Sequence, residues 1–267
     1  MTEADPALSH ELLFTPLKEL ASLTGIRSAG RTFESPPEGR QPDGPPGAVR
    51  GLANEGLAAA QVVRLIASAP RLATTPRGDG STVIDMPGWK APESSMAPIR
   101  AYLRWLGYDA RTWGLGANAG NPERDAALMA DHVIERAAQS GRPVALVGWS
   151  LGGVVAREVA RAVPQAVSKV VTFGSPIIGG PTHTFAARSY SPAERDRIEE
   201  LIEETDRENP LYVPVTAIFT RRDGVVNWRA CIDRRTEGVR HIEVKSSHLG
   251  LGIDPDVWQA VAEALAA

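Results

Sequence analysis

Ser150 is the residue whose surroundings point most directly to chemistry. Residues 147–153 read Val-Gly-Trp-Ser-Leu-Gly-Gly and contain Gly-x-Ser-x-Gly, between an apolar run and a helix-compatible stretch. A serine on so tight a strand-to-helix turn exposes its hydroxyl, and the glycines are needed because side chains there would collide with the neighbouring strand and helix. The pentapeptide alone is short enough to occur by chance, so its context decides. That context predicts a nucleophilic serine.

A serine hydroxyl needs a base to take its proton, usually an imidazole held by a carboxylate. In a parallel sheet these groups should follow the carboxyl ends of strands, in the order Ser, acid, His. Asp223 follows the strand predicted over Pro214 to Phe219, and His248 follows the one predicted over His241 to Lys245. Ser150, Asp223 and His248 are therefore the predicted catalytic residues.

The competing acids and histidines fit these roles less well. Taken alone, Asp223 before glycine would be an ordinary turn residue, and only its combination with the other two positions favours catalysis. His183, in the loop after Phe173, is a substrate-pocket candidate, although a chance loop histidine is the simpler explanation. The weaker alternatives are His10, His132 and His241 for the base, and Asp233 and Glu243 for the acid.

Nucleophilic attack by a serine on a carbonyl carbon also needs hydrogen-bond donors for the oxyanion of the transition state. The backbone N–H of Leu151, at the start of the helix, is one candidate. The second should follow the strand predicted over Thr82 to Met86, and we choose the N–H of Trp89, because the preceding glycine lets the chain turn. A structural turn with a packed tryptophan explains this segment equally well. Trp149 is expected to pack and to border the substrate pocket.

No cofactor or metal is implied by the motifs. The metalloprotease pattern His-Glu-x-x-His is absent, and Cys231 is the only cysteine. Residues 114–120, Gly-Leu-Gly-Ala-Asn-Ala-Gly, nearly match a dinucleotide fingerprint, but the third glycine is one position late. A loop explains this segment better.

Composition limits the class of protein. The 267 residues are 43% hydrophobic, enough for a large α/β core, and the net charge of −3 offers no general attraction for nucleic acid. No apolar run approaches the length of a membrane span, and the first 25 residues lack the basic and apolar regions of a signal peptide. We therefore expect a soluble cytoplasmic protein acting on a small molecule.

Strand and helix patterns alternate from residue 78 to residue 267. They predict a doubly wound, mainly parallel sheet of about six strands with flanking helices. The last helix is expected to begin after Asp254, and the one before the serine strand at Asn121. The expected strands are Thr82 to Met86, Tyr108 to Trp113, Val144 to Val147, Lys169 to Phe173, Pro214 to Phe219 and His241 to Lys245.

Two segments stand outside this alternation. Residues 1–77 read as an N-terminal extension with a helix at Leu12 to Leu23, an irregular proline-rich stretch at Gly30 to Gly51 and an apolar helix at Asn54 to Leu72. Residues 181–213 hold a charged helix that could be a small cap over the site or a plain solvated connection. The apolar helix is expected to bury Leu57, Val62, Leu65 and Ile66, and the extension is a candidate surface for homo-oligomerisation.

From about Gly78 onward the chain resembles α/β-hydrolases, in particular bacterial lipases and esterases with a minimal, six-stranded fold. The resemblance rests on residues 83–89 (Val-Ile-Asp-Met-Pro-Gly-Trp), 147–153, 222–226 (Arg-Asp-Gly-Val-Val) and 247–250 (Ser-His-Leu-Gly). It implies that Ser150 is the nucleophile, Asp223 the orienting acid and His248 the general base and acid. The backbone N–H groups of Trp89 and Leu151 would then be the oxyanion donors. Many relatives have His-Gly in place of Pro87-Gly88, and residues 1–77 fall outside the match.

The sequence therefore predicts a serine hydrolase that cleaves a carboxylic ester through an acyl-enzyme. Acyl transfer and amide hydrolysis by the same residues stay open, because exclusion of water and the acceptor site decide between them. A non-catalytic ligand-binding protein of the same fold is a third alternative. The natural substrate and its chain length are not specified by these motifs.

Overall fold

The computed structural model describes residues 30–33, 35–37, 41–47 and 58–267. They build one seven-stranded sheet in the order β1-β7-β6-β5-β4-β2-β3. Strands β2 to β7 are parallel, and β1 is antiparallel to β7. The strands are β1 (Arg31–Phe33), β2 (Thr82–Met86), β3 (Asp109–Thr112), β4 (Val144–Trp149), β5 (Val167–Phe173), β6 (Val215–Phe219) and β7 (Arg240–Glu243).

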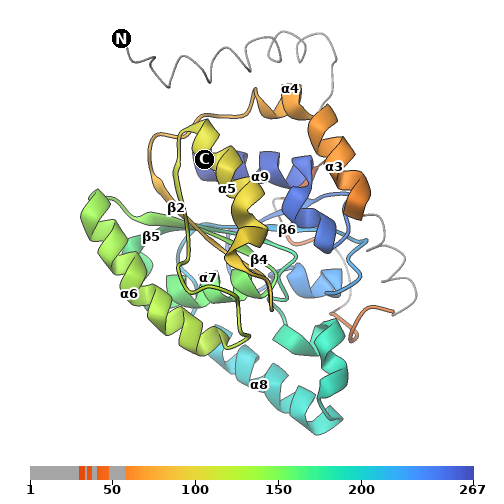
Figure 1. The fold of residues 1–267 in the computed structure, drawn as a ribbon. Helices are drawn as coiled ribbons and strands as arrows, with labels where there is room; N and C mark the ends of the chain where they lie inside the picture. The colour runs from red at the N-terminus through yellow and green to blue at the C-terminus, as the bar shows by residue number, and fades with distance from the viewer. Residues whose placement is uncertain (1–29, 34, 38–40, 48–57) are drawn as a thin grey trace, which may run out of the picture.

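Helices cover both faces of the sheet (Figure 1). One face carries α3 (Ala58–Ala67), α4 (Ala69–Leu72), α5 (Ala97–Leu106) and α9 (Pro255–Ala266). The other carries α6 (Pro122–Ser140) and α7 (Leu151–Ala162), with α8 (Pro192–Glu208) beyond them. Six 3-10 helices complete the described part: η1 (Glu93–Met96), η2 (Pro164–Ala166), η3 (Gly180–His183), η4 (Phe185–Ser189), η5 (Trp228–Cys231) and η6 (Leu249–Ile253).

The parallel strands supply two separate hydrophobic cores because neighbouring side chains of a strand point to opposite faces. On β4, Val147 joins the core under α5 and α9, whereas Leu146 joins the core under α6 and α7. On β2, Val83 and Ile84 divide in the same way. Burial on both faces explains why these strands read as continuous apolar runs.

The predicted doubly wound, mainly parallel sheet is confirmed, and it has one strand more than the six expected. The additional strand, β1, lies within the stretch that we expected to be irregular. Its three residues pair antiparallel with β7, and the ring of Phe33 lies 6.3 Å from that of Phe219. Three residues are too few to show a period of two, so this strand depends on an edge that only the folded sheet provides.

The apolar helix of the N-terminal extension is present as α3 and α4, but its predicted buried face is only partly right, since Leu65 packs half-buried against the core whereas Val62 and Ile66 do not. Val62 and Ile66 are 48% and 71% exposed. The inward face instead carries Arg64, whose guanidinium pairs with Asp254 at 2.8 Å and Asp256 at 2.7 Å beside the start of α9. The predicted helix at 12–23, Leu57 and residues 54–57 lie outside the described residues.

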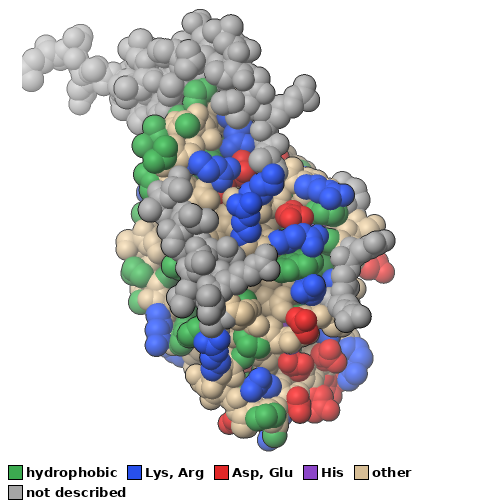
Figure 2. Space-filling model, turned by 90° about the vertical axis from the view of Figure 1, so that its right-hand side faces the viewer, with side chains coloured by type: hydrophobic (Ala, Val, Ile, Leu, Met, Phe, Trp, Pro, Cys, Tyr) green, Lys and Arg blue, Asp and Glu red, His purple; other side chains and the backbone are tan. Residues whose placement is uncertain are grey.

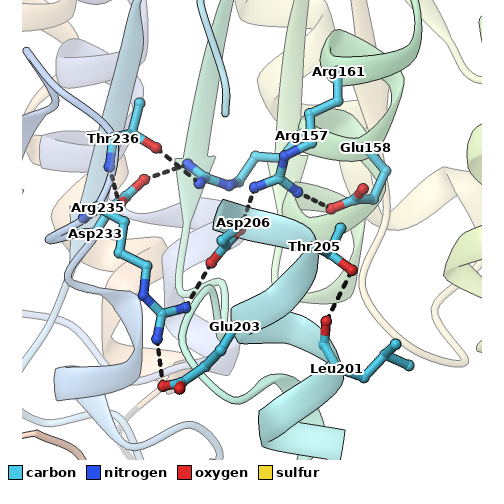
Figure 3. Close-up of polar contacts among 10 residues, drawn as sticks. All are labelled: Arg157, Glu158, Arg161, Leu201, Glu203, Thr205, Asp206, Asp233, Arg235 and Thr236. Carbon is cyan, nitrogen blue, oxygen red and sulfur yellow. Dashed lines mark hydrogen bonds and ion pairs between the residues drawn. The ribbon is translucent and has the colours of Figure 1, made fainter. Parts of the chain in front are cut away.

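Helix α8 is fastened to the body of the protein by ion pairs, drawn in Figure 3. Asp206, near its end, accepts hydrogen bonds from Arg161 of α7 and from Arg235, the latter at 2.8 Å. Arg235 also pairs with Glu203 at 2.5 Å. The side chains of Arg161 and Asp206 are only 8% and 7% exposed, so water screens their interaction little.

The carboxyl ends of the parallel strands point to the right in Figure 1, and Figure 2 shows that side of the molecule. Lys and Arg side chains form a band across its upper half, whereas Asp and Glu gather lower down, where Figure 1 places α8. Acidic side chains are thus most frequent in one part of this face, where basic side chains lie among them. Among the described residues, none of the helices combines the length and apolarity of a membrane span.

Replacing Asp206 should destabilise the fold more than replacing an exposed acid of the same helix. We expect Asp206→Asn to lower the free energy of unfolding by about 2–4 kcal/mol, because it removes the buried carboxylate that Arg161 and Arg235 share and leaves Arg161 with Glu158 alone. Glu204→Gln is the matched control, since its pair with Arg207 is exposed and should contribute less than about 1 kcal/mol. Urea unfolding measures both, and equal losses would contradict the role given to Asp206.

Candidate active site

The turn between β4 and α7 holds Ser150 in a strained backbone conformation. Its φ is 53° and its ψ is −122°, and in the described part of the chain only Lys90 shares a positive φ among non-glycine residues. The Ser150 N–H donates to the carbonyl of Phe173 on β5 at 2.9 Å. Such strain persists only where the surroundings enforce it, and it frequently accompanies function.

The flanking glycines show what enforces this conformation. A Cβ on Gly148 would lie 2.3 Å from the Cα of Gly153, and one on Gly152 would lie 2.2 Å from the carbonyl oxygen of Met86. Strand, helix and the end of β2 are thus in backbone contact at the turn. The predicted reason for Gly-x-Ser-x-Gly, a lack of room for side chains, agrees with these distances.

Asp223 and His248 meet as the sequence predicts. Nδ1 of His248 lies 2.7 Å from Oδ2 of Asp223, and the two side chains are 5% and 1% exposed. The other oxygen, Oδ1, accepts the N–H groups of Val225 at 2.9 Å and Val226 at 2.6 Å. The carboxylate is therefore oriented by its own loop, and a carboxylate at Nδ1 selects the tautomer whose lone pair is on Nε2.

His248 lies at the carboxyl end of β5, beside the serine turn. A Cβ on Gly174 would be 3.1 Å from His248 Nδ1, and Gly174 directly follows Phe173, whose carbonyl binds Ser150. The ring of Trp149 stacks on Phe173 at 6.1 Å and lies 6.2 Å from the imidazole. These contacts bring Ser150, Asp223 and His248 to one edge of the sheet.

The loop after β2 borders Ser150 from the other side. A Cβ on Gly88 would lie 3.3 Å from the Cβ and 3.9 Å from the Oγ of Ser150. Trp89 directly follows Gly88, and Leu151, the first residue of α7, directly follows Ser150, so both supply a backbone N–H in the immediate surroundings of Ser150. Backbone donors next to a nucleophile are what an oxyanion needs.

The two substrate-pocket candidates lie in different surroundings. Trp149 packs in the site between Phe173 and His248, half-buried, as its expected packing role requires. His183 is buried in η3, with Nε2 3.5 Å from Glu199, and lines a hollow of about 140 Å³ that also includes Gln41. Burial lowers the pKa of His183.

The alternative acids are occupied elsewhere. Asp233 forms a buried ion pair with Arg157 at 2.7 Å, and its N–H donates to Nε2 of His241. Glu243 pairs with Arg221 at 3.0 Å. Neither carboxylate is the partner of His248, which supports the choice of Asp223.

Two polar contacts, one on β2 and one on the loop after it, were not predicted from the sequence. Arg100 of α5 donates two hydrogen bonds, of 2.6 and 2.7 Å, to the buried carboxylate of Asp85, and burial raises the pKa of Asp85 to about 6. Asn118 binds the same loop from the glycine-rich segment that we had explained only as a loop. An aspartate inside an otherwise apolar strand was the available signal for the contact between Arg100 and Asp85.

Within the described residues, no cluster of His, Cys, Asp and Glu could hold a metal ion.

Comparison with known proteins agrees with this architecture. A family model described as the alpha/beta hydrolase family matches residues 80–266. The chain belongs to the alpha/beta hydrolase family. Among solved structures, this alpha/beta hydrolase superposes on one of the metagenome-derived lipolytic enzymes LipS and LipT with a TM-score of 0.55 and 16% identity, over 72% of this chain and 94% of that one. The lin2722 product of Listeria innocua superposes with a TM-score of 0.50 and 15% identity, over 68% of this chain and 92% of that one. At these identities the likeness concerns the fold.

Sequence relatives match a shorter stretch. The chain is 31% identical over 102 residues to the pimeloyl-[acyl-carrier protein] methyl ester esterase of Vibrio campbellii, which is 37% of this chain and 38% of that protein. The protein of the same name from Aliivibrio salmonicida is also 31% identical over 102 residues, covering 37% of each chain. The similarity thus spans well under half the length of either relative.

The raised pKa of Asp85 should make stability depend on pH. The folded protein holds this proton more tightly than the unfolded chain, whose aspartates titrate near about 3.9. The contribution of Asp85 to the free energy of unfolding should therefore fall by up to about 3 kcal/mol as the pH rises from about 4 to about 6. Urea unfolding of the wild type and of Asp85→Asn across this range isolates the effect, because the variant should lack this part of the slope. Parallel pH profiles would refute it.

Proposed function

We propose that this alpha/beta hydrolase cleaves carboxylic esters through an acyl-enzyme formed on Ser150. The observation that carries the proposal is the buried 2.7 Å contact between Asp223 and His248 at the sheet edge where the strained Ser150 turn lies. A hydroxyl on such a turn, next to an oriented imidazole, is the arrangement that nucleophilic catalysis requires.

In the first half-reaction, Nε2 of His248 takes the Ser150 proton as Oγ attacks the ester carbonyl carbon. The carbonyl oxygen becomes negative and receives hydrogen bonds from the N–H groups of Trp89 and Leu151. The tetrahedral intermediate then expels the alcohol, which leaves with the proton held by His248. Asp223 keeps the imidazole in one orientation and stabilises its protonated form.

In the second half-reaction, His248 takes a proton from water, and the resulting hydroxide oxygen attacks the acyl carbon on Ser150. The same backbone donors stabilise the second oxyanion. Collapse of this intermediate returns the proton to Oγ and releases the carboxylic acid. Ser150, His248 and Asp223 are regenerated, and no cofactor takes part in these steps.

The comparisons support an ester as the substrate. The family is one of hydrolases, and the two sequence relatives are named as methyl ester esterases.

In this proposal residues 181–213 form a small cap that stays in place. Backbone pairing of Thr184 with Val226 sets η4 beside the Asp223 loop, and Asp206 fastens α8.

Two substitutions test the proposed roles. On short p-nitrophenyl esters, Ser150→Ala should lower kcat by at least about 10⁴-fold, because no nucleophile remains. Asp223→Asn should lower kcat by about 10⁴-fold with little change in stability, because the imidazole loses its orienting carboxylate. Glu243→Gln, an acid of β7 paired with Arg221, is the control and should keep wild-type activity.

A fluorophosphonate probe separates the alternatives. It should label wild-type protein at Ser150 and leave Ser150→Ala unlabelled. Hydrolysis that survives Ser150→Ala would defeat the serine mechanism, and absent labelling with intact ligand binding would indicate a non-catalytic binding protein. Amide substrates and added alcohol acceptors, run on the same preparations, distinguish ester hydrolysis from amide hydrolysis and acyl transfer.

A further inference from the structure

The glycine-rich segment at residues 114–120 carries a fully buried asparagine that binds the loop beside Ser150. Asn118 is 0% exposed. Its Nδ2 donates to the carbonyl of Pro87 at 2.9 Å, its carbonyl accepts the N–H of Lys90 at 2.8 Å, and its own N–H donates to the carbonyl of Ala91 at 3.1 Å. Its side-chain oxygen accepts the N–H of Gly120 at 3.0 Å, so every polar group of this residue has a partner.

These bonds lie on both sides of the peptide that matters for the oxyanion. The bond to Pro87 holds the peptide that joins Pro87 to Gly88, and the bond from Lys90 holds the peptide that joins Trp89 to Lys90. Because peptide groups are planar, fixing the two outer ones restricts the rotation of the Gly88–Trp89 peptide between them. That middle peptide carries the Trp89 N–H.

The segment is itself held firmly. Trp113 Nε1 donates to the carbonyl of Gly116 at 2.8 Å, and the N–H of Gly116 donates to Glu93 at 2.8 Å. Gly120 lies against the Trp89 ring, since a Cβ there would be 2.7 Å from its Nε1. The positive φ angles of the glycines, 79° at Gly114, 76° at Gly116 and 90° at Gly120, explain their spacing without a nucleotide.

We propose that Asn118 is a positioning residue that aims the Trp89 N–H at the oxyanion. It acts through the loop at residues 87–91 and does not touch the substrate. This inference rests on the proposed ester hydrolysis at Ser150, because only a developing oxyanion gives the Trp89 N–H a catalytic use. It assigns to the glycine-rich segment a role in the transition state and not in binding a cofactor.

The test compares two replacements of Asn118. Asn118→Asp keeps the acceptor for Gly120 and removes the donor to Pro87, whereas Asn118→Ala removes both without burying a charge. Each should lower kcat for a short p-nitrophenyl ester by roughly 10- to 100-fold, approaching the loss seen when an oxyanion donor is removed. KM should change by less than about threefold, because the donor acts on the transition state.

Asn121→Asp is the matched control. It makes the same chemical change three residues away, at the N-cap of α6, where the side chain accepts the N–H of Arg124 and aspartate serves equally well. Its kcat and KM should equal those of the wild type. In each Asn118 and Asn121 variant, the final extent of fluorophosphonate labelling measures the fraction of molecules whose Ser150 is reactive. Dividing kcat by this fraction corrects for misfolded protein.

The outcomes separate this inference from the proposed function. If kcat per labelled serine is unchanged in Asn118→Asp and Asn118→Ala, or if only KM rises, the positioning role is wrong. If Ser150→Ala retains hydrolysis, the proposed function fails first. A selective loss of kcat in both Asn118 variants, with Asn121→Asp unaffected and Ser150→Ala inactive, supports the two together.

Discussion

Direct contact between three backbones at the Ser150 turn is the constraint on which the candidate site depends. The end of β2, the end of β4 and the start of α7 approach so closely that a Cβ at Gly148 or Gly152 would overlap main-chain atoms. This contact holds Ser150 at a φ of 53°. It also brings the loop after β2 close to the Ser150 hydroxyl, so one steric constraint sets the positions of both the serine and this loop.

The other loops at this edge are secured by buried polar groups. Asp223 is oriented by two N–H groups of its own loop before it binds His248. The loop after β2 is held by Asn118 on one side, and Arg100 binds Asp85 at the end of the strand that precedes it. Each group is hydrogen-bonded, which burial requires. These hydrogen bonds tie the loops at this edge to one another and to the ends of the strands.

The parallel strands, the serine turn and the order of Ser150, Asp223 and His248 could be predicted because each depends on local patterns. A strand buried on both faces shows as an apolar run, and a tight turn shows as glycines. The three-residue β1 was missed because its partner, β7, is distant in the sequence. The buried face of α3 was predicted only in part, with Leu65 right and Val62 and Ile66 wrong, because its attachment depends on Arg64 and two aspartates almost two hundred residues away.

The contacts of Asn118 are the clearest example of what could not be predicted from the sequence. In the sequence it is one polar residue among glycines, and only the folding of residues 114–120 against the loop after β2 supplies its partners. The sequence by itself determined the fold class and the residue types that could do chemistry, since these follow from periodicity and local steric limits. The tertiary structure alone decided which face of α3 is buried, which short strand pairs with β7 and which groups Asn118 binds. Those choices depend on hydrogen bonds and ion pairs between segments far apart in the chain, which no local pattern encodes.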